Sequence, residues 1–76
     1  MERSLKEIAL EIRADWKNPY FGAVPYINAM ALMNSVDDNF FADNGREVVI
    51  YFLANASTWR GEVARRIKKE LNSLVK

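Results

Sequence analysis

The sequence of 76 residues contains no cysteine and no histidine. Without cysteine the chain has no disulfide and no thiolate nucleophile, and without both residues a structural zinc site lacks its usual ligands. The absence of histidine also removes the commonest general base at neutral pH. We therefore expect a non-enzymatic protein with no metal site and no cofactor, whose stability comes from packing.

Long apolar runs are also missing. No run approaches the roughly 18–20 residues of a membrane-spanning helix, and residues 1–7 contain no apolar core of signal-peptide length. We therefore expect a soluble, cytoplasmic protein without membrane association. The length indicates a single domain over residues 1–76 with one core, and such a small domain is marginally stable. Half of the residues are apolar, which suits a compact core rather than a disordered chain.

Glycine is scarce, and its three copies form no phosphate-binding loop. The acidic segment 37–47 does not have the spacing of a calcium-binding EF-hand, because Phe41 occupies a ligand position and Gly45 is displaced. We interpret this segment as a polar connection that caps helices. Ser57 and Thr58 have no visible base partner and stand where a helix N-cap is needed. No small-molecule substrate is indicated.

The most apolar stretch of the chain is Val48–Ala56. On a helix its apolar side chains point in nearly every direction, interrupted only by Asn55, so this helix should be buried on most sides. Its β-branched and aromatic residues also suit a strand. However, Asn44 followed by Glu47 is typical of a helix N-terminus, and no other segment alternates as a pairing strand would. We predict a buried central helix over residues 44–56.

Two helices are expected before this central helix. Ser4 and Glu7 form a capping box ahead of an apolar stripe, which predicts a helix over residues 5–16 with solvated carboxylates on its outer side. Pro25 is tolerated in the first turn of a helix, and the apolar spacing after it predicts a helix over 23–34. In the connection that follows, a single helical turn after Ser35 would let the phenylalanines at 40 and 41 reach the core.

A last helix is predicted over residues 59–74, with Ser57-Thr58 as its N-cap. Its apolar stripe consists of five side chains at three- and four-residue spacing: Trp59, Val63, Ile67, Leu71 and Leu74. With the three preceding helices it makes an all-α, four-helix domain. No internal repeat or low-complexity segment is present.

The net charge of +1 hides an asymmetry along the chain. Residues 1–56 carry five basic and eight acidic side chains, a net of −3, whereas residues 57–76 carry six basic and two acidic, a net of +4. Five cations of the last helix are candidate contacts for nucleic acid or a partner: Arg60, Arg65, Arg66, Lys68 and Lys69. A helix-turn-helix reader is one interpretation. The near-neutral total charge favours the other, a solvated face whose cations suit the helix dipole.

The aromatic residues have two interpretations as well. Trp16, Tyr20, Phe21, Tyr26 and Trp59 could form a partner-binding surface, although bulky aromatics in so small a domain more often complete the core. The apolar surplus of the central helix favours self-association as a homodimer or contact with another protein. Nucleic-acid binding through the last helix is the alternative function.

Three motifs resemble a family of short uncharacterised proteins encoded by bacterial phages, prophages and other mobile elements. They are Asp15-Trp16-Lys17-Asn18, the segment from Tyr20 to Tyr26 reading YFGAVPY, and YFLANA at 51–56 followed by WRGE at 59–62. The resemblance covers most of the chain. It implies a phage-related origin and a small helical fold, and it implies no activity and no functional residues.

Overall fold

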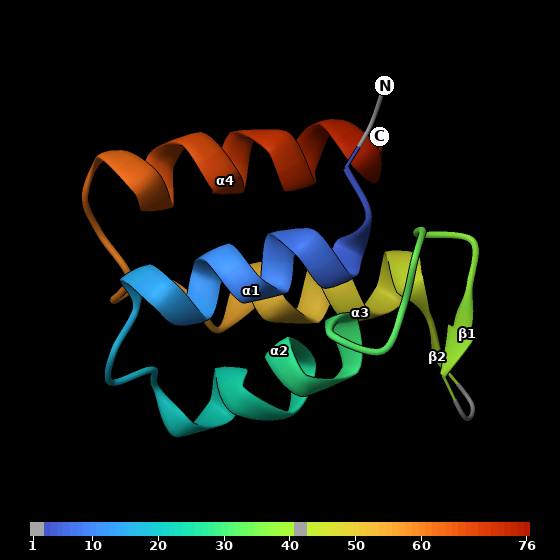
Figure 1. Cartoon of the computed structure of the whole chain (residues 1–76), viewed down its shortest axis with the longest axis horizontal. Helices are drawn as coiled ribbons and strands as arrows, with labels where there is room; N and C mark the ends of the chain where they lie inside the picture. Colours follow the sequence, from blue (N-terminus) through green and yellow to red (C-terminus); the bar gives the residue numbers. More distant parts are fainter. Residues whose placement is uncertain (1–2, 41–42) are drawn as a thin grey trace.

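The protein is a four-helix domain, seen here in a computed structural model that describes residues 3–40 and 43–76, Phe40 through its backbone only (Figure 1). The helices are α1 (Leu5–Asp15), α2 (Val24–Met30), α3 (Gly45–Ala54) and α4 (Glu62–Leu74), with a short 3-10 helix η1 (Phe21–Ala23) before α2. Two-residue strands β1 (Asn39–Phe40) and β2 (Asp43–Asn44) pair antiparallel between α2 and α3. The all-α prediction is confirmed. None of the helices in the described ranges is long and apolar enough to cross a membrane.

The four helices close into a ring around one core. α1 packs against α2 and α4, and α3 packs against the same two helices from the opposite side. In Figure 1, α4 runs alongside α1 at the top, while α3 lies behind α1 and α2 lies below it. Each helix therefore turns one face to the core and leaves another face to solvent.

Both capping boxes predicted from the sequence are present. The hydroxyl of Ser4 accepts a hydrogen bond from the amide of Glu7, whose carboxylate accepts one from the amide of Ser4. Asn44 and Glu47 form the same reciprocal pair at the start of α3. These bonds satisfy amide donors that a helix N-terminus otherwise leaves free. They explain why α1 and α3 start where the sequence predicted.

The all-round burial expected of the central helix needs correction. Val48, Val49 and Phe52 are fully buried, but Ile50 and Tyr51 keep 46% and 43% of their surface exposed. The physical reason is the ring arrangement, because α2 and α4 are the only described helices that pack closely against α3. An apolar strip of α3 is left at the surface.

The second helix ends at Met30, four residues before the predicted boundary at 34. The amides of residues 32 and 33 bond to carbonyls only three residues back, which tightens the chain out of the helix. The freed carbonyls of Met33 and Asn34 then accept hydrogen bonds from the amides of Lys6 and Leu5, both at 3.0 Å. The early end of α2 thus completes the N-terminal cap of α1. As predicted, Pro25 lies in the first turn of α2.

The connection between α2 and α3 begins with a hydrogen-bonded turn over Ser35–Asp38. The Asp38 carboxylate accepts bonds from the amides of Asn34 and Ser35 at 2.7 and 3.3 Å, so it caps this turn and not a helix. The helix cap expected from segment 37–47 comes from Asn44, which caps α3. The short β1–β2 ladder that follows was not predicted. The expected burial of the phenylalanine side chains at 40 and 41 lies outside the described part of the structure.

The last helix begins at Glu62 rather than at 59, and Gly61, not Ser57 or Thr58, is its N-cap. The cause is Trp59, which is buried before the helix starts. Its ring stacks on Trp16 with centroids 5.6 Å apart, and its Nε1–H donates to the Asp15 carboxylate at 2.8 Å. The chain must leave this anchored position before it can turn into α4.

Candidate functional site

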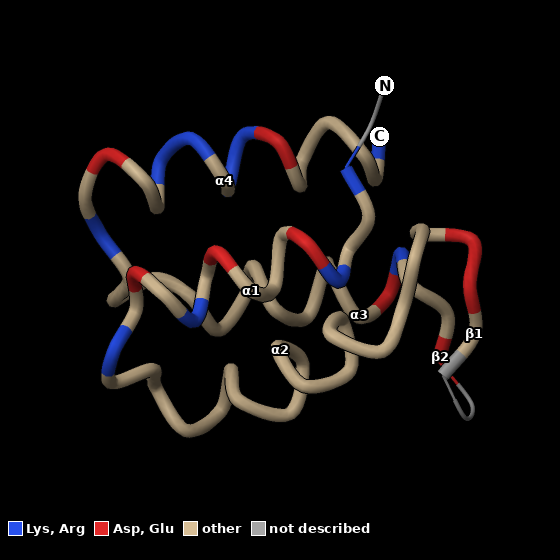
Figure 2. Tube along the Cα trace, in the orientation of Figure 1, with Lys and Arg blue, Asp and Glu red and all other residues tan. Residues whose placement is uncertain are grey.

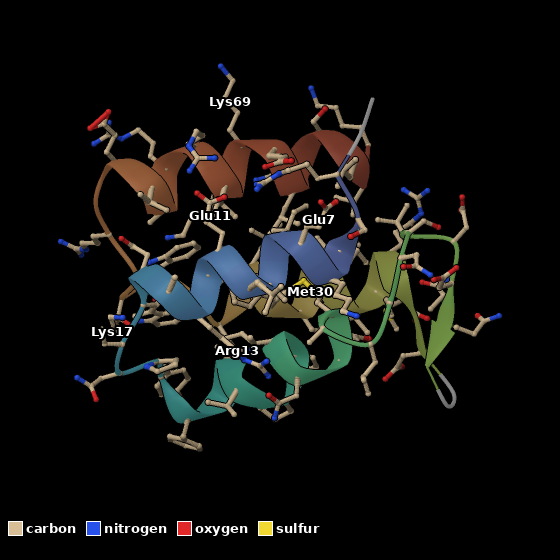
Figure 3. All side chains as sticks on the ribbon, viewed as in Figure 1. Glu7, Glu11, Arg13, Lys17, Met30 and Lys69 are labelled. Carbon is tan, nitrogen blue, oxygen red and sulfur yellow. The ribbon has the colours of Figure 1, made fainter. Side chains whose placement is uncertain are left out.

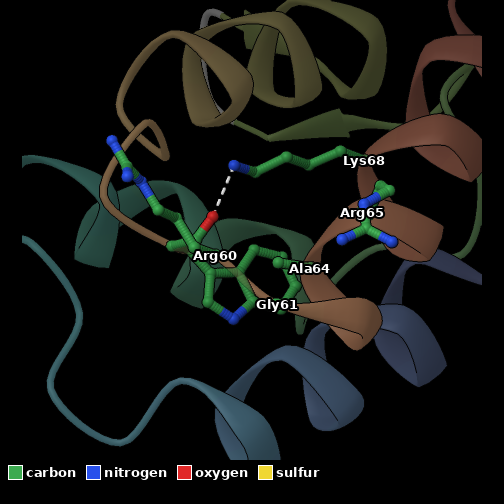
Figure 4. Close-up of a pocket in the computed structure, with 6 residues that line it drawn as sticks. Arg60, Gly61, Ala64, Arg65 and Lys68 are labelled. Atoms are coloured by element: carbon green, nitrogen blue, oxygen red, sulfur yellow. Dashed lines mark hydrogen bonds between the residues drawn. The ribbon is translucent and has the colours of Figure 1, made fainter.

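Three of the five candidate cations surround one hollow at the start of α4. The hollow has a volume of about 320 Å³ and is lined by Trp59, Arg60, Gly61, Ala64, Arg65 and Lys68. Figure 4 shows the Lys68 side chain reaching across it, with Arg60 and Arg65 also at its wall. We call this feature the basic hollow.

The spacing of the lining residues explains why they converge. Residues 61, 64, 65 and 68 are three or four positions apart, so they share one face of a helix. Arg60 joins them from the loop because Gly61 has φ +118°, a left-handed conformation that favours glycine and redirects the chain into α4. The buried ring of Trp59 fixes the position of this loop.

The Lys68 ammonium is the most enclosed of the three cations. Its Nζ donates to the backbone carbonyl of Trp59 at 2.6 Å and lies 5.9 Å from the centroid of the Trp59 ring. Desolvation and then the nearby positive charge of Arg60 lower the pKa of Lys68 below its ordinary value. Within the described residues Arg60, Arg65 and Lys68 form no ion pair. Their positive charges therefore have no paired carboxylate in the part of the chain that the structure describes.

The two remaining candidates are placed elsewhere. Arg66 forms an ion pair with Glu11 of α1, and Arg3 joins the same carboxylate at 2.7 Å while bonding Glu70 of α4 at 2.6 Å. Lys69 points away from the molecule on the outer side of α4 (Figure 3). The five cations predicted together are thus divided into a hollow, an interhelical ion network and one solvated lysine.

The ion network also corrects the expectation that the outer carboxylates of the first helix are merely solvated. The Glu11 carboxylate accepts hydrogen bonds from two arginines, and the Asp15 carboxylate accepts one from the indole N–H of Trp59. The hydrogen bonds from Arg66 and then Arg3 hold the pKa of Glu11 below its ordinary value. The pKa of Glu7 is also below its ordinary value, mainly because its carboxylate accepts a hydrogen bond from the Ser4 amide. Both carboxylates favour the folded state when ionised.

Replacing Glu11 with glutamine should make the stability of the protein depend less on pH in the acidic range. A carboxyl group whose folded pKa is depressed contributes stability above its unfolded pKa, about 4.3, and loses it as pH falls through the folded pKa. The urea midpoint of the parent should therefore drop between about pH 5 and pH 3. The drop should be smaller for Glu11→Gln.

Asp37→Asn is the matched control, since the Asp37 carboxylate forms no ion pair with any described residue. Its urea midpoints at pH 7 and pH 3 should differ as much as those of the parent. Equal drops for the parent and Glu11→Gln would show that the network contributes nothing that depends on its charge.

A second surface is distinguished by having no charge. No charged residue occurs between Lys17 and Asp37, or between Glu47 and Arg60. These two stretches contain α2 and most of α3, which pack against each other. Figure 2 shows α2 and its flanking turns without a basic or acidic residue. The structure therefore joins two uncharged stretches that are separate in the sequence.

Several apolar side chains on this surface are exposed. Phe21 is 79% exposed and its ring lies 4.8 Å from that of Tyr20, centroid to centroid, while the rings of Tyr26 and Tyr51 lie 5.6 Å apart across α2 and α3. Together with their exposed or half-buried neighbours these residues define what we call the uncharged face: Tyr20, Phe21, Val24, Tyr26, Ile50, Tyr51 and Asn55.

The proposed aromatic surface is therefore split by the structure. Trp16 and Trp59 are in the core, with 9% and 2% exposed, as expected of bulky aromatics in a small domain. Tyr20 and Phe21 instead lie at the surface, 44% and 79% exposed. The sequence shows that residues 18–36 and 48–59 carry no charge, and this pattern could have indicated the face. Only the fold shows that the two stretches lie side by side.

Comparisons with protein-family models, with curated proteins and with solved structures found no match for this chain. The function must therefore be inferred from the basic hollow and the uncharged face alone.

Proposed function

We propose that the protein is a non-enzymatic interaction domain that binds a second copy of itself through the uncharged face. The observation that carries this proposal is the packing of two charge-free stretches into one surface with exposed aromatic rings. Exposed aromatic and aliphatic side chains on adjoining helices are typical of protein contact sites. Tyrosine and phenylalanine are also among the residues enriched at interfaces.

A second copy is favoured as the occupant because of charge. In a two-fold symmetric dimer each face meets its own copy, so any net charge on the face would repel itself. The uncharged face avoids that repulsion. A standard interface buries about 800 Å² on each partner, which is about a sixth of the 4940 Å² surface of this chain. A face spanning two of four helices suits an interface of that size.

Association also supplies stability that a short chain without disulfides lacks. A small core contributes little stability beyond what folding costs, and oligomerisation is one usual remedy. The midpoint of thermal unfolding should accordingly rise with protein concentration. The resemblance to phage and mobile-element proteins is compatible with such a role and adds no activity to it.

Replacing Tyr51 with glutamate should disrupt the dimer without unfolding the monomer. Tyr51 is 43% exposed and its ring lies beside that of Tyr26. The substitution puts a negative charge on the face of each copy, and these like charges would repel each other in the dimer. We expect the dimer dissociation constant to rise by roughly tenfold or more. Sedimentation equilibrium over a wide concentration range measures it, and circular dichroism checks that the variant stays helical.

Leu10→Glu is the matched control. Leu10 is 55% exposed on α1, outside the uncharged face, so the same added charge should leave association unchanged. A parent protein that sediments at 8.8 kDa at every concentration would overturn self-association. Equal weakening by both variants would place the contact elsewhere.

Nucleic-acid binding through α4 is the second candidate, and the basic hollow is the observation in its favour. An extended nucleic-acid backbone is bound by several cations that neutralise successive phosphates. Here Arg66 is held by Glu11 and Lys69 points to another side. Buried Trp59 and N-cap Gly61 also leave little in the first turn of α4 to read base edges. This arrangement favours binding of a small anion at one site over binding of an extended nucleic-acid backbone.

A further inference from the structure

We propose that the basic hollow binds a single phosphate group, either as free phosphate or as the phosphate of a small molecule. Arginine and lysine side chains are hydrogen-bond donors without acceptors, and three of them surround one hollow. Arginine guanidinium groups match the oxygens of a phosphate in planar pairs, and lysine adds a point charge. The proposal concerns a surface separate from the uncharged face and does not depend on self-association.

The charges of the hollow lack a counter-ion within the described residues. Arg66, one position beyond Arg65, already has Glu11 as a partner, whereas Arg60, Arg65 and Lys68 form no ion pair. Lys68 uses one of its three donors on the Trp59 carbonyl, which leaves two for a ligand. Because desolvation and the charge of Arg60 already disfavour the Lys68 ammonium, a bound anion would relieve an existing electrostatic cost.

The size of the hollow suits a small ligand. Its volume of about 320 Å³ lies at the lower end of the roughly 300–1,000 Å³ range of small-molecule sites. Gly61 and Ala64 form part of its wall without bulky side chains, so a phosphate group can approach the backbone between the cations. The dipole of the 13-residue helix α4 adds a favourable field for an anion at this end.

The site can be tested by nitrogen-15 NMR titration of the full chain with inorganic phosphate and with glycerol 3-phosphate. Sodium chloride at matched ionic strength and glycerol are the blanks. We expect saturable shifts confined to residues 59–68, with half-saturation at or below about 10 mM. Comparing the two phosphates distinguishes a free ion from a phosphomonoester as the preferred source.

Arg60→Gln combined with Arg65→Gln should weaken this binding by roughly tenfold or more, the loss expected when charge-assisted hydrogen bonds are removed. Both side chains are exposed, so the fold should survive, which the amide spectrum verifies directly. Lys69→Gln is the matched control, since Lys69 lies on the same helix outside the hollow, and it should leave the titration unchanged.

Three results would overturn the proposal. One is the absence of saturation with either phosphate, and another is an equal loss from Lys69→Gln. The third is binding of a thymidine decamer without binding of the small phosphates, which would identify a nucleic-acid surface instead.

Discussion

Replacing Phe52 with alanine should leave the protein largely unfolded. Phe52 is fully buried, and its ring meets Trp16 and Trp59 edge-on at centroid distances of 6.3 and 6.2 Å. Removing a buried phenylalanine ring costs about 3–5 kcal/mol, which equals the roughly 3–5 kcal/mol that a single core of this size supplies. Circular dichroism should show lost helix, and tryptophan fluorescence should report exposure of both indoles.

Phe21→Ala is the matched control, because it removes the same atoms from a ring that is 79% exposed. Its stability should stay within about 0.5 kcal/mol of the parent, as for most surface substitutions. Both variants should be measured at low protein concentration, where the proposed association through the uncharged face would contribute least. A Phe52→Ala variant as stable as the parent would mean that α3 does not fill the core.

The parts of the fold predicted from the sequence depend on neighbours along the chain. The capping boxes Ser4/Glu7 and Asn44/Glu47 each involve two residues three positions apart, so the sequence contains the complete signal. The same holds for the buried stripe of α4, where Ile67 and Leu71 lie in the core. Local hydrogen bonds and helical periodicity can be read directly from residue order.

The errors have their causes in contacts between distant segments. The sequence predicts too early a start for α4 because Trp59 fits a helical stripe, whereas its indole N–H donates to Asp15, 44 residues away. The sequence groups Arg66 with the other cations because all five belong to the last predicted helix, but Glu11 on α1 pairs with it. Neither partner can be identified from spacing, since both depend on how α1 lies against α4.

The exposure of Ile50 and Tyr51 has the same origin. An apolar helix indicates burial only if enough neighbours exist to cover it, and four short helices in a ring leave one side of each uncovered. The central helix does carry more apolar side chains than its neighbours cover, and the exposed ones lie on a surface that α3 shares with α2. This is the surface through which we propose that the protein self-associates.

Replacing Gly45 with alanine should destabilise the protein, although helix propensity alone predicts the opposite. Alanine is more favourable than glycine in a helix by up to about 1 kcal/mol, and Gly45 does not have a positive φ. However, a Cβ at this position would lie 2.5 Å from the Ser35 carbonyl oxygen and 2.7 Å from the Val36 Cα. Both are backbone atoms that no rotamer change can move.

The clash falls where the connection is hydrogen-bonded to the start of α3. The Gly45 amide donates to the Asp38 carbonyl at 2.7 Å, and the Arg46 amide donates to the Val36 carbonyl at 2.9 Å. Separating the two segments to admit a methyl group would stretch both bonds. We therefore expect a net loss of about 1–3 kcal/mol, the usual cost of overpacking, measured as a lower urea midpoint.

Gly22→Ala distinguishes this mechanism from a general intolerance of alanine. Its Cβ would be equally crowded, at 2.6 Å from the Tyr20 ring and 2.8 Å from the Asn55 amide oxygen. Those atoms belong to side chains at the surface, which can rotate away, so the loss should be smaller than at Gly45, below about 1 kcal/mol. A larger loss at Gly22, or a Gly45→Ala variant as stable as the parent, would show that residues 35 and 36 are not held tightly against α3.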